Sequence, residues 1–241
     1  MTTLITGNRT LLSMEKPTEL QRKKAKWIRV IDLDKCIGCN VCTKSCIEAN
    51  FVPKDPDQQE WIKIYSIENT QNKSTSFFPL TCMHCQNAPC VKVCPVGASY
   101  YDENQIVLVD QETCIGCRLC MAACPYEARY FNWEEPKHSS EELQHTYSDE
   151  APWPHRKGVV EKCMFCAYRI KKDELPICII SCPQKALLFG NLDLNTVSNG
   201  QGETWKLSTL LDEELAYRFK EELGTEPSVY YLPPHRRLRE A

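Results

Sequence analysis

The stretch CIGCNVCTKSC, residues 36–46, places four thiols within 11 residues and decides the fold of this chain. The arrangement recurs, so that the 16 cysteines of the sequence form four groups of four, which we call quartets. In chain order the quartets are Cys36, Cys39, Cys42 and Cys46; Cys82, Cys85, Cys90 and Cys94; Cys114, Cys117, Cys120 and Cys124; and Cys163, Cys166, Cys178 and Cys182. Such a recurring sulfur loop indicates sets of ligands rather than scattered structural cysteines.

Disulfide pairing is one alternative, because the number of cysteines is even. Disulfide-stapled proteins are typically short secreted scaffolds with scattered cysteine spacings, whereas this chain has 241 residues. Its N-terminal extension, residues 1–26, contains neither a twin-arginine pair nor a sustained apolar core, so we expect no signal peptide. The disulfide interpretation is therefore disfavoured.

Zinc is a second alternative, but a structural zinc site takes two well-separated C-x2-C pairs around one tetrahedral ion. Here three thiols of each quartet lie in one turn and the fourth lies apart. This arrangement suits a cubane, because each of its four irons needs one ligand. The first and third quartets have the spacing C-x2-C-x2-C-x3-C, which is typical of bacterial iron–sulfur proteins in which the fourth cysteine binds the other cluster of a pair. We therefore predict four [4Fe-4S] clusters held by all sixteen cysteines.

Small residues inside the loops fit this chemistry. Gly38 and Gly116 let backbone N–H groups approach the sulfur atoms, and both also suit a tight turn. His84 holds the corresponding place in the second loop, where four cysteines are present, so we predict a packing or hydrogen-bonding neighbour rather than a ligand. Proline follows the last cysteine of three quartets, at Pro95, Pro125 and Pro183, and is expected to end a short helix there. Ile47 follows the first quartet instead, so we expect a longer helix.

The gaps between quartets predict which of them exchange their fourth cysteine. The second and third quartets are separated by residues 95–113, which is 19 residues, whereas residues 47–81 (35) and 125–162 (38) fill the other gaps. The short gap is similar to that of a compact two-cluster ferredoxin, so we expect the middle quartets to pair and the outer two to pair across them. The four predicted ligand sets are Cys36, Cys39, Cys42 and Cys182; Cys163, Cys166, Cys178 and Cys46; Cys82, Cys85, Cys90 and Cys124; and Cys114, Cys117, Cys120 and Cys94.

Strand patterns flank the quartets. They are predicted at residues 26–35 and 105–110, before the first and third quartets, and at residues 98–101, 128–131 and 186–189, after the second, third and fourth. The predicted fold class is α+β, with tandem ferredoxin-like halves forming one four-cluster domain over residues 27–191.

Two segments lie outside this pattern. Residues 134–158 are polar and broken by prolines, which predicts an inserted surface loop, either a solvated excursion or a docking segment that uses Trp153. Residues 192–241 are expected to form a C-terminal helix and arm, with helical apolar spacing over residues 204–223 and an extended tail over residues 227–241.

Composition excludes several classes of function. The formal net charge is −3, so no global basic field attracts nucleic acid, and the basic clusters at residues 22–26 and 235–239 are expected to be solvated tails. No apolar run approaches the roughly 20 residues of a membrane-spanning helix. The sequence contains no flavin or nicotinamide fingerprint, P-loop or nucleophile motif. Several one-electron centres without a catalytic motif indicate a non-catalytic electron relay.

The quartet spacings, 2-2-3, 2-4-3, 2-2-3 and 2-11-3, resemble those of the four-cluster electron-transfer (beta) subunit of molybdopterin oxidoreductases of the dimethyl sulfoxide reductase family. The resemblance covers about residues 27–191, and EANFVP (residues 48–53) with EWIKIY (residues 60–65) is similar to the polysulfide and tetrathionate reductase branch. It implies two partners, a molybdopterin catalytic subunit and a quinone-interacting integral membrane subunit. By analogy, the set with Cys182 would face the catalytic subunit and the set with Cys94 the membrane side.

The resemblance also narrows the alternatives. Nitrate reductase relatives replace one cysteine of the third quartet with tryptophan and hold a three-iron cluster, but Cys117 is present here. Formate dehydrogenase relatives often add a C-terminal membrane helix, which this sequence does not show. Membrane association through a partner is expected, and both a cytoplasmic location and export of the folded chain with a partner fit the sequence. A free-standing soluble polyferredoxin carrier is the alternative function.

Overall fold

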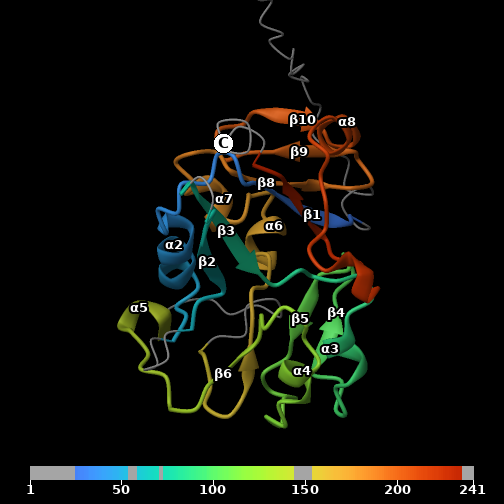
Figure 1. The fold of residues 1–241 in the computed structure, drawn as a ribbon. Helices are drawn as coiled ribbons and strands as arrows, with labels where there is room; N and C mark the ends of the chain where they lie inside the picture. Colours follow the sequence, from blue (N-terminus) through green and yellow to red (C-terminus); the bar gives the residue numbers. More distant parts are fainter. Residues whose placement is uncertain (1–24, 54–58, 71–72, 144–153, 235–241) are drawn as a thin grey trace, which may run out of the picture.

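The computed structural model describes residues 25–53, 59–70, 73–143 and 154–234. Its largest element is a five-stranded sheet with the order β10-β9-β8-β1-β11. The strands of this sheet are β1 (Trp27–Asp32), β8 (Leu187–Asn191), β9 (Thr196–Ser198), β10 (Thr204–Lys206) and β11 (Val229–Leu232). Figure 1 shows the sheet at one end of the molecule, whereas the hairpin of β4 (Ser99–Tyr101) and β5 (Val107–Val109) lies at the other end.

The strand β1 is buried on both faces, and this gives the sheet two different sides. Ile28 and Val30 lie in a small apolar core that includes residues of α8 (Leu207–Glu213). Because side chains alternate along a strand, Arg29 and Ile31 face the opposite side. On that side Ile31 belongs to the larger core, which contains eight of the sixteen cysteines and has three more packed against it. The sheet therefore separates α8 from the sulfur-rich part of the molecule.

Each quartet lies in a loop that leads into a short helix. These helices are α2 (Val41–Ala49), α3 (Pro89–Lys92), α4 (Leu119–Ala122) and α7 (Ile177–Ile180). The helix α2 continues beyond Cys46, as predicted from Ile47, whereas the other three have four residues each. The remaining elements are the hairpins β2 (Ile62–Glu68) with β3 (Thr75–Thr81) and β6 (Tyr130–Phe131) with β7 (Val160–Glu161), the helices α5 (Ser140–Leu143) and α6 (Ala167–Ile170), and the 3-10 helix η1 (Glu221–Leu223). No helix among the described residues has the length and apolar character needed to cross a membrane.

The five strands predicted beside the quartets are all present, as β1, β4, β5, β6 and β8. The strand after the second quartet, β4, pairs antiparallel with β5, which leads into the third. The strand after the fourth quartet, β8, pairs antiparallel in the same way with β1, which leads into the first. The two ends of the cysteine-bearing region are therefore joined across the middle quartets, and the mixture of helices and strands agrees with the predicted fold class.

The helix predicted from the apolar spacing of residues 204–223 is present only as α8, which packs on the smaller core, and the prediction is wrong for both ends of the range. The structure has β10 at its start, α8 in its middle and η1 at its end. Trp205 is largely buried and pairs with Val197 of β9, so packing on the sheet overrides the helical spacing of the apolar residues. The helix ends near Leu215, which has a left-handed backbone with φ of 50°.

The prediction of an extended C-terminal tail is also wrong for residues 229–232, which form a buried strand. The strand β11 pairs parallel with β1, and Val229 and Tyr231 are fully buried. The hydroxyl group of Tyr231 donates a hydrogen bond to the carbonyl oxygen of Pro79 in β3 at 2.9 Å. This segment is therefore part of the core, whereas the basic cluster at residues 235–239 lies outside the described residues.

The insertion at residues 134–158 is described at its two ends only, and Trp153 lies outside the described residues. Its returning end is fixed at one point, because His155 is 1% exposed, whereas Arg156 and Lys157 after it are exposed. The Nδ1 atom of His155 lies 2.6 Å from Oε1 of Glu161, and its Nε2 atom lies 2.8 Å from the carbonyl oxygen of Asn50 at the end of α2. The insertion is thus anchored to the loop that carries the first quartet.

The buried position of Tyr231 generates a prediction. Tyr231→Phe removes the hydrogen bond to Pro79 and leaves a buried carbonyl group without that donor, which costs about 1 kcal/mol. We expect the midpoint of anaerobic thermal unfolding, followed by circular dichroism, to fall by about 2–4 °C. The control Tyr230→Phe removes a hydroxyl group from a partly exposed neighbour in the same strand and is expected to change the midpoint little. Equal effects of the two substitutions would contradict this account of β11.

Candidate metal centres

One cavity is lined by thiols from opposite ends of the cysteine-bearing region. Cys36, Cys39 and Cys42 of the first quartet line it together with Cys182, the last cysteine of the fourth. The contact between α2 and α7 brings these two quartets together. The other lining residues include Ile37, Ile64, Pro79, Pro183, Gln184, Ala186 and Leu187, none of which carries a charge.

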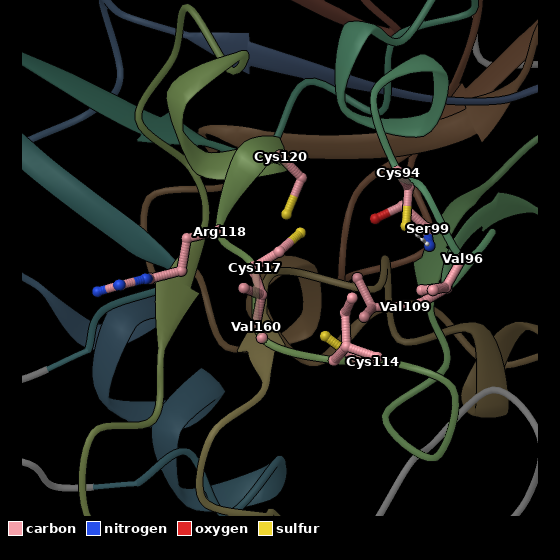
Figure 2. Close-up of a pocket in the computed structure, with 12 residues that line it drawn as sticks. Cys94, Val96, Ser99, Val109, Cys114, Cys117, Arg118, Cys120 and Val160 are labelled. Carbon is pink, nitrogen blue, oxygen red and sulfur yellow. Dashed lines mark hydrogen bonds between the residues drawn. The ribbon is translucent and has the colours of Figure 1, made fainter.

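A second cavity has the same composition at the other end of the molecule. Cys114, Cys117 and Cys120 of the third quartet line it with Cys94, the last cysteine of the second. In Figure 2 the four sulfur atoms face a common space, while the side chain of Arg118 points away from it. Packing of α3 against α4 places the two quartets side by side.

The remaining eight thiols form two further groups. Burial raises the pKa of Cys46 well above its ordinary value, and the nearby thiols of Cys163, Cys166 and Cys178 raise it further. In the other group, burial and the thiols of Cys82, Cys90 and Cys124 raise the pKa of Cys85 to about 12. The structure therefore brings Cys182, Cys94 and Cys46 each close to three thiols of another quartet, and Cys124 close to Cys85. That these groups bind iron as ligand sets stays a prediction.

Crowding and burial determine what these groups can bind. Burial, followed by the thiols of Cys178, Cys182 and Cys36, raises the pKa of Cys42 to about 12. Since a thiolate is the form that binds a metal, the four sulfur atoms of a set need a positively charged core between them. A cubane meets this need, because each of its irons takes one thiolate from a different direction. Among the described residues, no group of three or more candidate side chains is arranged to hold a single metal ion.

The loops share a backbone feature that the sequence reveals only in part. The second residue after the first cysteine of each quartet has a left-handed backbone, with φ values of 70° at Gly38, 41° at His84, 68° at Gly116 and 54° at Phe165. Sequence reasoning identified the first three positions but missed Phe165, whose equivalent place in the fourth loop was the available signal. His84 and Phe165 stack on each other, with ring centroids 3.7 Å apart, which accounts for two non-glycine residues in this conformation. His84 is therefore the packing neighbour that the sequence predicted.

Buried cations beside the thiols were not found from the sequence. Arg29 lies with Nη2 at 3.5 Å from Sγ of Cys178, and Lys162 donates from Nζ to the carbonyl oxygen of Cys163 at 2.6 Å. Arg129 is 4% exposed, and its Nε and Nη2 atoms have no hydrogen-bond partner among the described atoms. Its Nη1 donates to Oγ of Ser99 at 2.8 Å, but no carboxylate pairs with it among the described residues. A buried cation without an opposite charge is costly, so an anionic cluster with its thiolate ligands fits this site. A basic residue in the middle of the mostly apolar strand WIRVID was the one sequence signal for Arg29.

Comparisons with known proteins agree with this chemistry. The 4Fe-4S dicluster domain matches residues 35–98 in one form and residues 73–145 in another. A selenate reductase subunit of Mesobacillus selenatarsenatis is 36% identical over 244 residues, which cover 95% of this chain and 80% of the relative. The menaquinone reductase iron–sulfur cluster-binding subunit of Nitratidesulfovibrio vulgaris is 36% identical over 237 residues, covering 87% and 89%. The thiosulfate reductase electron transfer subunit of Salmonella typhi is 38% identical over 186 residues, covering 75% and 85%.

The loop geometry generates a prediction with a matched control. A Cβ atom at Gly116 would lie 2.1 Å from the carbonyl oxygen of Gly158, whereas a Cβ atom at Gly97 would meet nothing within 4 Å. Both glycines have φ near 70°, so both alanine variants carry the left-handed strain of about 1–2 kcal/mol. Only Gly116→Ala adds a collision, worth about 1–3 kcal/mol more. We expect a clearly lower unfolding midpoint for Gly116→Ala than for Gly97→Ala, and similar midpoints would refute the close approach of the two loops.

Proposed function

Because this chain belongs to the family of iron–sulfur electron-transfer subunits of molybdopterin oxidoreductases, we propose that it relays single electrons through four [4Fe-4S] clusters between a molybdopterin catalytic subunit and a quinone-interacting membrane subunit. The relatives are named as subunits of reductases, which implies a catalytic partner for this chain, and the chain itself is the non-catalytic member. When bound, each cluster accepts or releases one electron at a time.

The sixteen cysteines are proposed to bind iron in the nested sets. These are Cys36, Cys39, Cys42 and Cys182; Cys163, Cys166, Cys178 and Cys46; Cys82, Cys85, Cys90 and Cys124; and Cys114, Cys117, Cys120 and Cys94. The observation that supports this assignment most directly is the cavity shared by Cys182 and the first quartet, because these thiols are far apart in the sequence. A cluster bound within one quartet would not require that contact.

Contacts between sets support a linear order of clusters. Burial is the main cause of the raised pKa of Cys42, and Cys178 is the thiol that raises it most. Because Cys42 is in the set on Cys36 and Cys178 is in the set on Cys163, these two sets are neighbours. The pKa of Cys82 is raised by burial and by Cys163, although Lys162 opposes the rise, which joins the two inner sets. Burial and Cys90 raise the pKa of Cys120, although Arg129 opposes the rise. This contact joins the inner set on Cys82 to the outer set on Cys114. The proposed relay therefore runs from the set with Cys182 to the set with Cys94 through the two inner sets.

Both ends of this relay are accessible to partners. Cys39 is exposed at one end and Cys117 at the other. Each has an exposed apolar residue beside it, since Ile37 is 48% exposed and Ile115 is 63% exposed. We propose that the end with Ile37 contacts the catalytic subunit and that the end with Ile115 contacts the membrane subunit, as the family resemblance implies.

The nested assignment is tested by combining cysteine substitutions. Cys182→Ser is expected to perturb the same cluster as Cys39→Ser, because both remove a ligand from the set on Cys36. In electron paramagnetic resonance of anaerobically reduced protein, the double variant should therefore lose the signal of one cluster only. The matched control combines Cys182→Ser with Cys166→Ser, from the same quartet but different proposed sets, and should lose two. Loss of two signals in the first pair and one in the second would refute the nesting.

The role as a fixed subunit is tested by co-purification from native extracts. A free carrier would elute near its own 27.8 kDa, whereas a subunit elutes with a larger chain. Ile37→Asp places a charge at the first end and is expected to release the catalytic subunit while the membrane subunit stays bound. Ile115→Asp is expected to have the opposite effect. Elution of the unmodified chain alone would support the soluble carrier and contradict the proposal.

A further inference from the structure

Three buried cations lie near the cysteine sets, and none of them pairs with a carboxylate among the described residues. Among the described lysine and arginine residues, only Arg29, Arg129 and Lys162 are buried, at 1%, 4% and 4% exposure. None of the ion pairs between described residues involves these three side chains. A buried charge without an opposite charge is costly, so their retention calls for a function.

Two of the three lie beside the inner cysteine sets, and the third lies between an inner and an outer set. Arg29 approaches Cys163 and Cys178, whose sulfur atoms are 3.9 Å and 3.5 Å from its Nη2. Arg129 donates from Nη1 to Oγ of Ser99 at 2.8 Å, and the thiols that interact most strongly with it are Cys90 of an inner set and Cys120 of the outer set. Lys162 interacts with Cys82 and Cys163, and so stands between the two inner sets. The cavities of the two outer sets contain one cation between them, Arg118, which is exposed and points away.

The guanidinium group of Arg29 is held in one place. Its Nη1 donates to Oγ1 of Thr81 at 3.3 Å, and Thr81 in turn donates to the carbonyl oxygen of Trp61 at 3.0 Å. The guanidinium carbon lies 4.8 Å from the centroid of the Phe165 ring. A charge fixed by a strand, a hydroxyl group and a ring keeps its distance from the sulfur atoms, so its electrostatic effect is constant.

Reduction of a [4Fe-4S] cluster adds one negative charge to an already anionic site. In the chain alone, water reaches the outer sets, where Cys39 and Cys117 are exposed, whereas Cys163 and Cys178, which Arg29 faces, are buried. Burial alone would lower the reduction potential of the inner clusters and place a barrier in the middle of the relay. A fixed positive charge near the sulfur atoms has the opposite effect, because it favours the more negative reduced state.

We propose that Arg29 raises the reduction potential of the cluster bound by Cys163, Cys166, Cys178 and Cys46. Lys162 does the same for the inner cluster beside it, and Arg129 acts both on that inner cluster and on the outer cluster bound through Cys120. In the step that they favour, the inner cluster gains one electron and the neighbouring cluster that supplies it is oxidised by one electron. No covalent bond changes, and no proton is transferred because the cations keep theirs. This inference rests on the proposed function, since it requires the clusters to be bound.

The test is a redox titration of the anaerobic complex, followed by electron paramagnetic resonance, with iron and sulfide measured on each sample. In Arg29→Gln we expect one of the four midpoints to fall by at least about 59 mV, which is a tenfold shift in its electron-transfer equilibrium with the other clusters. Arg29→Lys keeps the charge and should restore most of the midpoint. The control Lys206→Gln removes an exposed charge in β10, outside the two cysteine cavities, and should leave all four midpoints nearly unchanged.

The outcomes separate the inference from the proposed function. Unchanged midpoints in an Arg29→Gln variant with full iron and sulfide would overturn the role of Arg29 and leave the relay intact. If Arg29→Gln loses its clusters, Arg129→Gln decides instead, with a lowered midpoint for the neighbouring inner cluster as the expected result and unchanged midpoints as the contradiction. Unmodified protein without iron and sulfide would overturn the proposed function itself.

Discussion

Repulsion among buried thiolates is the constraint on which the rest of this structure depends. Burial and neighbouring thiols raise the pKa of Cys166 to about 12, and Cys42 and Cys85 are raised to a similar value. Sulfur atoms in this state cannot all ionise unless positive charge lies between them. Iron in a cubane supplies that charge, so we expect cluster insertion and folding to be coupled in this chain.

The fold meets this constraint by using one hairpin-like unit twice. The amide group of Asp110 donates to the carbonyl oxygen of Ala98 at 2.8 Å, and the amide group of Asp32 donates to Ala186 at the same distance. In both places an aspartate carboxylate then accepts hydrogen bonds from the turn that leads to the first cysteine of a quartet. The middle pair of quartets joins through residues that are close in sequence, whereas the outer pair closes over them. Pairing of β8 with β1 brings the outer two quartets together, which the proposed nested sets require.

Local patterns in the sequence were sufficient for the cysteine loops and the five strands beside them, because spacing and alternation determine both. They were insufficient where a distant partner decides. The spacing that favoured a helix at residues 204–206 yields to pairing with β9, and the apparent tail at residues 229–232 is buried only because β1 offers it an open edge. Arg29 and Phe165 were missed for the same reason, since a buried cation and a left-handed aromatic residue are explained by the neighbours that surround them in space.

Anomalous X-ray diffraction at the iron absorption edge, on crystals grown without oxygen, tests the central claim most directly. The account predicts four separate groups of four irons, each bonded to three sulfur atoms of one quartet and to the last cysteine of its partner. The groups should follow one another from the exposed Cys39 to the exposed Cys117. Single metal ions, disulfide bonds among these cysteines, or clusters bound within single quartets would contradict it.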